Sequence, residues 1–449
     1  MQESLLSVGI DLGTSTTQLI FSRLHLKNKS QGAAVPKMEI FKKEILYKSD
    51  IHFTPLKSST EIDAPKVLEI IKAEYKNAGF SPKDTDTGAV IITGETARKE
   101  NAAKVLEIMS EFSGDFVVAT AGADLESILS AKGAGIDKVS KEQRILIANA
   151  DIGGGTTNIA LYKNGILQDT ACLDIGGRLI RYDQNQIITY IAPKLKQIIQ
   201  KENLCLAEGK KLDTDHLNIV LDCMVNALFC DLGKTKSSYR DLLITHRGLE
   251  NTENITHLSF SGGVAEGIYT QIQNPFAFGD IGVFLAEKIK NSPHFSKFML
   301  VQGTETIRAT VVGAGSHAVS LSGSTVYFPP DLLPLKNIPV SVISAQNPIL
   351  PKTDTVTLFH ITDVKDTSFS ALSTLAKQIA KQAKENLLLF NFEADIGKSF
   401  GYILQSKLPD THLISMDSLK LKSGDYIDIG KPASMGTVLP VVIKTLLFQ

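Results

Sequence analysis

The sequence DIGGGTTN, residues 151–158, lies between two apolar runs, 145–148 and 159–162. This pattern predicts two strands joined by a tight glycine turn. Glycine permits positive φ and lets a ligand approach the backbone, and successive bare N–H groups form a concave site for phosphate oxygens. Asp151 would repel bare phosphate, so its place before the turn makes sense if a hydrated divalent cation lies between them. A single turn of this kind is equally consistent with an ordinary glycine hairpin.

A second copy of the pattern occurs near the start of the chain. An apolar run, 5–10, leads into the sequence DLGTSTT, residues 11–17, and a second strand is predicted over 18–24. Two such hairpins at a domain-sized separation predict a duplicated fold with one phosphate-binding turn in each half. A third glycine turn, at Gly262 and Gly263, follows a predicted strand over 255–260. No acidic residue and no cluster of hydroxyl residues accompanies this turn. Its bare backbone is suited to contact the flat face of an adenine–ribose group.

The three turns together predict one nucleotide cleft, because their joint occurrence with these partners favours a site over three unrelated turns. Asp11 and Asp151 are predicted to hold the waters of a Mg²⁺ ion, since magnesium keeps several waters and takes only one or two carboxylates. The residues predicted to bind the nucleotide are Asp11, Gly13, Thr14, Ser15, Thr16, Gly153, Gly154, Gly155, Thr156, Thr157, Gly262 and Gly263.

Three carboxylates are candidates for the catalytic role. Glu95 follows a predicted buried strand, 89–93, although an acid at a helix start is an equally good explanation for it. Asp124 and Glu126 stand at the head of a predicted helix, 124–132, where a carboxylate would orient an attacking water. Arg178 is a candidate contact to phosphate or to a partner, with a surface ion pair as the alternative.

Composition limits the class of protein. The chain has 449 residues, 43% hydrophobic and 21% charged, so two or three globular domains are expected. Its 47 Lys and Arg nearly balance its 48 Asp and Glu, which predicts no nucleic-acid partner. No signal peptide and no run of ~20 apolar residues is found, so a cytoplasmic protein without a membrane partner is expected. The four cysteines form no CxxC pair and are predicted to be buried, reduced thiols.

Hydrophobic periodicity and the positions of glycine and proline predict the helices and strands. Alternating strands and helices predict an α/β fold with a partly parallel sheet. Helices are predicted over 62–78, 99–112, 124–132, 185–201, 219–229, 280–289, 307–321 and 370–386. Two of them carry small residues at four-residue spacing, which would let two helices approach closely, or pack as an ordinary tight pair. These residues are Ala123, Ser127 and Ala131 in one helix and Thr310, Ala314 and Ala318 in the other.

The three turns resemble the phosphate 1, phosphate 2 and adenosine motifs of the actin, Hsp70 and sugar-kinase superfamily over about residues 5–325. The resemblance implies two ribonuclease-H-like α/β domains around a nucleotide cleft that binds ATP and Mg²⁺. The expected division is a first domain over 1–145 with an inserted segment, a second over 146–325, and a C-terminal α+β extension over 326–449 that packs on the core. The catalytic lysine of Hsp70 has no match here, so weak ATPase activity is expected.

Segments across the whole chain are also similar to the EutA family. They are 11–24, 88–102, 115–122, 151–161, 172–180 and 425–446. This resemblance implies an ATP-dependent, chaperone-like reactivating factor for ethanolamine ammonia-lyase. It implies that adenosylcobalamin is the cargo of the lyase, to be exchanged for damaged cobalamin, and that the protein resides in the cytoplasm near the ethanolamine microcompartment. The alternatives are a diol dehydratase reactivase, a small-molecule kinase and an actin-like filament protein. A homo-oligomer is left open.

Overall fold

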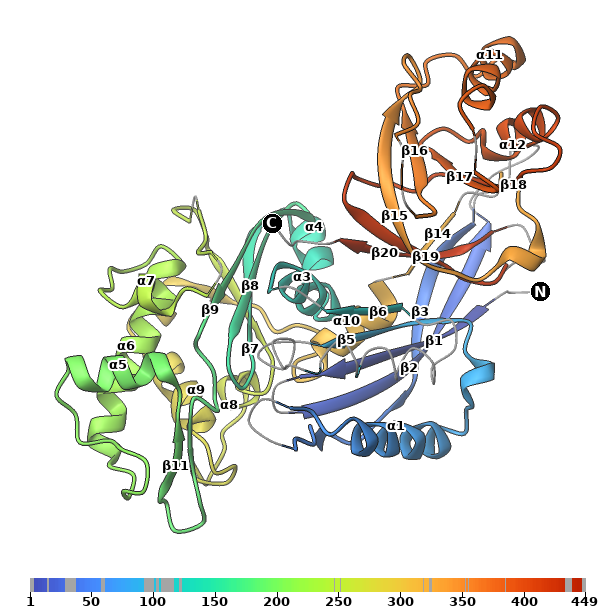
Figure 1. Cartoon of the computed structure of the whole chain (residues 1–449). Helices are drawn as coiled ribbons and strands as arrows, with labels where there is room; N and C mark the ends of the chain where they lie inside the picture. Colours follow the sequence, from blue (N-terminus) through green and yellow to red (C-terminus); the bar gives the residue numbers. More distant parts are fainter. Residues whose placement is uncertain are drawn as a thin grey trace.

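The computed structural model describes most of the chain, and its larger sheets follow one another along the sequence (Figure 1). The described residues are 4–13, 16–28, 38–57, 61–92, 101, 105, 117–120, 123–245, 247–250, 252–317, 319–322, 325–351, 353, 355–383, 385–432 and 438–445. The predicted helix over 99–112 lies almost entirely outside these residues.

The first sheet has the strand order β3-β2-β1-β5-β6. Its strands are β1 (Ser4–Leu12), β2 (Thr16–Asn28), β3 (Met38–Lys48), β5 (Thr87–Ile92) and β6 (Val117–Thr120), and the short β4 (His52–Phe53) pairs with β2. Neighbours among β1, β2 and β3 are antiparallel, whereas β5 and β6 run parallel to β1. Helix α1 (Ala64–Ala78) buries Val67, Ile71 and Tyr75 against this sheet and ends at the left-handed Gly79.

The second sheet repeats this arrangement, with the order β9-β8-β7-β12-β13. Its strands are β7 (Leu146–Ile152), β8 (Thr157–Lys163), β9 (Ile166–Leu173), β12 (His257–Ser261) and β13 (Met299–Leu300). Neighbours among β7, β8 and β9 are antiparallel, and β12 and β13 run parallel to β7. The same order and directions in both sheets confirm the predicted pair of ribonuclease-H-like domains. Each phosphate turn is the first hairpin of its domain.

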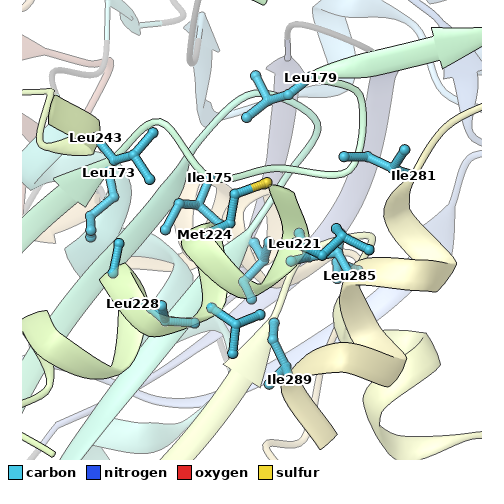
Figure 2. Packing of buried hydrophobic residues seen from close by; sticks show 14 of the residues in the cluster. Leu173, Ile175, Leu179, Leu221, Met224, Leu228, Leu243, Ile281, Leu285 and Ile289 are labelled. Carbon is cyan, nitrogen blue, oxygen red and sulfur yellow. The ribbon is translucent and has the colours of Figure 1, made fainter. Parts of the chain in front are cut away.

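The second domain has the larger hydrophobic core, shown in Figure 2. Helix α6 (Thr214–Asp231) contributes Leu221, Met224 and Leu228, and α9 (Gly282–Lys290) contributes Leu285 and Ile289. These side chains pack with Leu173, the last residue of β9, and with Ile175 and Leu179, which follow it. The remaining helices are α4 (Ile136–Gln143), α5 (Pro193–Lys201), α7 (Arg240–Leu243) and α8 (Ala265–Tyr269).

The predicted helix over 185–201 is wrong in its first half. Residues Ile188–Ile191 form strand β11, which pairs with β10 (Ile180–Tyr182), and the helix begins only at Pro193. Proline favours the first helical position and disfavours helix in the residue before it. The apolar spacing of Ile188 and Ile191 therefore reflects burial of a strand and not one face of a helix.

Two helices connect the domains, and each packs on the sheet of the domain that it enters. Helix α3 (Ala123–Gly133) follows β6 and packs on β7, β8 and β9, whereas α10 (Ala309–His317) packs on β1, β2 and β5. The helices cross at glycines: a Cβ at Gly133 would lie 1.8 Å from the Ala309 carbonyl oxygen, and one at Gly313 would lie 2.0 Å from that of Leu129. The close approach is confirmed for these two helices.

Of the residues predicted to make this approach, Ala131 packs in one buried cluster with Ala309 of α10, whereas Ser127 and Thr310 have polar contacts elsewhere. Ser127 Oγ donates to the Ala123 carbonyl and lies 3.5 Å from the Ala171 carbonyl of β9, and Thr310 Oγ1 donates to Asp151. Helix α10 ends at His317, short of the predicted 321, and residues 319–321 form strand β14 (Val319–Leu321). Ala318 lies outside the described residues.

The C-terminal region forms a third sheet, in the order β14-β20-β19-β15-β16-β17-β18. Its further strands are β15 (Leu335–Ser344), β16 (Leu358–Thr362), β17 (Leu387–Phe392), β18 (His412–Asp417), β19 (Asp425–Ile429) and β20 (Pro440–Thr445). Strands β15 to β18 are parallel, and α11 (Phe369–Ala380) and α12 (Gly397–Gln405) pack on one face of them. Val442 of β20 packs with Leu5, Leu24 and Leu26, so the extension rests on the first domain (Figure 1).

The prediction of buried thiols holds only in part. Cys172 in β9 is buried, but Cys205 is exposed in the loop after α5, and all four cysteines are free. An apolar neighbourhood in sequence does not bury a residue in a loop, because connecting segments run over the surface. Within the described ranges, no helix is both long and apolar enough to cross a membrane.

Candidate functional site

The three glycine turns meet at a cleft of about 520 Å³ between the two domains. Residues from β1, β2 and β4 line it from the first domain, and residues from the turns after β7 and β12 line it from the second. The lining includes these residues expected from the sequence: Asp11, Gly13, Thr16, Glu126, Asp151, Gly153, Gly154, Gly155, Thr156, Arg178, Gly262 and Gly263. Thr14, Ser15 and Glu95 lie outside the described residues.

The two predicted phosphate turns are closed by the same backbone hydrogen bond. The Gly13 amide donates to the Thr16 carbonyl at 2.9 Å, and the Gly153 amide donates to the Thr156 carbonyl at 2.9 Å. The second turn is also held from behind, because the Arg178 amide donates to the Gly154 carbonyl at 2.7 Å. Thr157 was predicted to bind the nucleotide, but it is fully buried and absent from the cleft lining. Its hydroxyl donates instead to the Ile175 carbonyl at 2.7 Å.

The third turn depends on glycine for its shape. Gly262 has φ of +85°, and a Cβ there would lie 2.4 Å from the Ile152 carbonyl oxygen. This close approach places the turn directly against the end of β7. The following segment adds apolar side chains to the cleft that the sequence did not single out. They are Val264, Ile272, Ala277, Phe278 and Val283. Ile272, Ala277 and Phe278 lie in the loop between α8 and α9, where no periodicity reveals them before folding, whereas Val283 belongs to α9.

Asp151 is the most deeply buried carboxylate in the cleft lining, with 5% of its surface exposed. Its Oδ1 accepts a hydrogen bond from Ser261 Oγ at 2.6 Å, and its Oδ2 accepts one from Thr310 Oγ1 at 3.3 Å. Asn149 Nδ2 donates to the same Ser261 oxygen at 3.0 Å, so the Ser261 proton is directed at Asp151. Burial raises the pKa of Asp151 to about 6, although both hydroxyl donors oppose that rise.

Glu126 and Asp124 both lie in the first turn of α3, but only Glu126 faces the cleft. Glu126 is buried and lines the cleft. Asp124 does not line it: its carboxylate accepts a hydrogen bond from Thr170 Oγ1 and lies 3.7 Å from Arg247 Nε. Residues two apart on a helix do not share a face, so only one of the two acids can reach the cleft. The geometry thus favours Glu126 over Asp124 as the acid that faces a bound ligand.

A protein-family model supplies the decisive comparison. The model described as ethanolamine utilisation protein EutA matches residues 3–449. The chain belongs to the EutA family. Among relatives, this EutA family member is 36% identical to a protein of Salmonella typhimurium named ethanolamine ammonia-lyase reactivase EutA, over 99% of this chain and 98% of that one. A protein of the same name from Escherichia coli is also 36% identical, with the same coverage.

Solved structures overlap with this EutA family member only loosely. The Ppx/GppA family protein of Aquifex aeolicus has a TM-score of 0.40 and 12% sequence identity, and it covers 69% of this chain and 97% of its own. The repeated strand order of the two sheets establishes the fold.

Proposed function

We propose that this protein is an ATP-dependent reactivating factor for ethanolamine ammonia-lyase, which promotes exchange of damaged cobalamin for intact adenosylcobalamin. The supporting observation is 36% identity, over 99% of the chain, to two proteins named ethanolamine ammonia-lyase reactivases. The cleft adds a physical means, because a ligand held by turns from two domains favours one relative orientation of those domains. A change of orientation then alters affinity for a partner protein.

The cleft residues fit a nucleotide with a hydrated Mg²⁺ ion. Gly153, Gly154 and Gly155 present backbone without side chains, as phosphate oxygens require. Asp151 is buried and lines the cleft beside this glycine turn. A cation bound between its carboxylate and the phosphates would offset the repulsion between these negative groups. Asp11 and Asp151 would hold Mg²⁺ through its waters, and the bound ion would supply charge neutralisation at the phosphates. The apolar side chains around Phe278 suit a base.

The roles of the chain's own residues follow from their positions. The Gly13 and Gly153 turns bind polyphosphate from opposite domains and so draw the domains together. Glu126 orients water toward the terminal phosphate from the head of α3, a connecting helix. Slow hydrolysis then releases the closed arrangement. We place this cycle in the cytoplasm, at or near the ethanolamine microcompartment.

A reactivation assay tests the function. Ethanolamine ammonia-lyase inactivated with cyanocobalamin should recover activity when the purified protein, ATP, Mg²⁺ and adenosylcobalamin are added together. Omission of ATP, omission of Mg²⁺ and substitution of ADP serve as controls, and each should abolish sustained recovery. Equal recovery without ATP, or no recovery in the complete mixture, would contradict the proposal.

A further inference from the structure

Phe53 is an exposed aromatic residue that is tied to the first phosphate turn. The residue is 75% exposed although it lines the cleft. Strand β4 pairs Phe53 with Thr16, and the neighbouring Thr54 Oγ1 donates to the Gly13 carbonyl at 2.8 Å. Thr54 Oγ1 also lies 3.2 Å from Thr17 Oγ1. These contacts fix the backbone at Phe53 relative to the Gly13 turn.

Arg178 has the corresponding relation to the second phosphate turn. Its amide donates to the Gly154 carbonyl at 2.7 Å, and its side chain also lines the cleft. The guanidinium carbon lies 5.4 Å from the centroid of the Phe53 ring, within the range of a cation–π contact. Its ion pair with Asp280 is long, at 3.9 Å from Nε to Oδ2, which is beyond hydrogen-bond distance. The nearby carboxylate thus leaves Nε available to another acceptor.

We propose that Phe53 and Arg178 form a latch that joins the two phosphate turns across the cleft and retains the bound nucleotide. The inference rests on the proposed nucleotide role of the cleft. Each partner is anchored to one turn, so the distance between ring and guanidinium follows the distance between the turns. A guanidinium stacks through its flat face and donates hydrogen bonds from its edge, so Arg178 can contact Phe53 and a phosphate oxygen at the same time.

A double-mutant cycle on the full-length protein tests the latch. Phe53→Leu, Arg178→Gln and the double variant are compared with the unmodified chain for ATP and ADP affinity and for nucleotide release rate. Each single variant should weaken ATP binding about two- to tenfold, the size of a cation–π contact, with faster release. The double variant should be no weaker than Arg178→Gln alone, because the two side chains act through one contact. Phe53→Tyr, which keeps the ring, should retain affinity.

The chain offers a matched control pair outside the cleft. Arg181 lies over the Tyr190 ring at 4.6 Å in the β10–β11 hairpin, and neither residue lines the cleft. Arg181→Gln and Tyr190→Leu should leave nucleotide affinity and release unchanged. Equal thermal unfolding midpoints for all variants would show that binding differences do not come from misfolding.

A spectroscopic reporter gives a readout that a purely structural role would not move. The chain contains no tryptophan, so Phe53→Trp introduces a single tryptophan at the contact, which can be excited selectively over the ten tyrosines. Its emission should change when ATP and Mg²⁺ are added, and Arg178→Gln in that background should remove the change.

Two results overturn the latch while leaving the nucleotide cleft intact. They are additive effects in the cycle, and emission that ignores nucleotide although the unmodified chain binds ATP. Absence of any ATP binding by the unmodified chain is a different result: it contradicts the proposed function itself, and the latch with it.

Discussion

Asp151 is needed for the proposed function as an ionised carboxylate, but its burial makes that ionised form unfavourable for the stability of the fold. In an unfolded chain an aspartate titrates near pH ~4, whereas burial raises the pKa of Asp151 in the fold to about 6. The folded protein therefore binds an additional proton between these values, and stability falls as pH rises through that window. Above pH 6 the carboxylate is ionised in both states, and the free energy of unfolding is then lower by roughly 3 kcal/mol, the value for a pKa shift of this size.

Replacement of this carboxylate should therefore stabilise the protein at neutral pH. Asp151→Asn keeps an oxygen that can accept from Ser261 and removes the buried charge, so we expect a gain of about 1–3 kcal/mol at pH 8 without ligand. The gain should shrink as pH falls from 6 toward 4. Urea unfolding across this pH range measures it, and a gain that grows at acid pH would contradict the stated cause. The same variant should lose Mg²⁺-dependent ATPase activity.

The two acids at the head of α3 make separable predictions. Glu126→Gln should lower ATPase activity about 10²-fold, the usual size of a lost general base or water-orienting group, while ATP affinity stays close to normal. Asp124→Asn is the matched control: it removes one of the two carboxylates that face Arg247 outside the cleft and should leave ATPase activity unchanged. A comparison of initial hydrolysis rates decides between them. An equal loss in both variants would point to a structural effect on α3.

At the scale of elements, the connecting helices depend on two glycines at their crossing. A Cβ at Gly313 would overlap the Leu129 carbonyl, which belongs to backbone and cannot rotate away. We therefore expect Gly313→Ala to destabilise the protein by about 1–3 kcal/mol through overpacking, as seen by thermal or chemical unfolding. Gly263→Ala is the control, since nothing lies within 4 Å of a Cβ there. Equal stability of the two variants would show that α3 and α10 separate without cost.

Helix boundaries differ in how far the neighbouring residues predict them. Helix α1 ends at the left-handed Gly79, where the sequence predicts its end. Helix α6 begins at Thr214 after the capping residue Asp213, five residues before its predicted start at 219, so this cap was a local signal that the prediction missed. The region before Pro193 could not be assigned in this way. Two isoleucines three residues apart fit a helix face, and only their pairing with β10 shows that they belong to a strand.

At the scale of the whole molecule, duplication explains why the cleft has two similar sides. Strand order and direction match in the two domains, so their first hairpins bring Gly13 and Gly153 to equivalent positions. The exchange of α3 and α10 between the sheets links the domains on one side of this cleft. The division at 145/146 and 325/326 stays a prediction. The described contacts add that β14, before the second boundary, pairs with β20 of the C-terminal sheet.

The family and the two glycine hairpins could be predicted from sequence, because turn chemistry and motif order depend on residues that are close along the chain. The folded structure was needed to show which groups face the cleft. It turned Glu126 inward and Asp124 outward, buried Thr157, placed the helix crossing at Gly133 and Gly313, and brought Phe53 to Arg178. These outcomes depend on packing between segments far apart in sequence, and no local periodicity or turn signal carries that information.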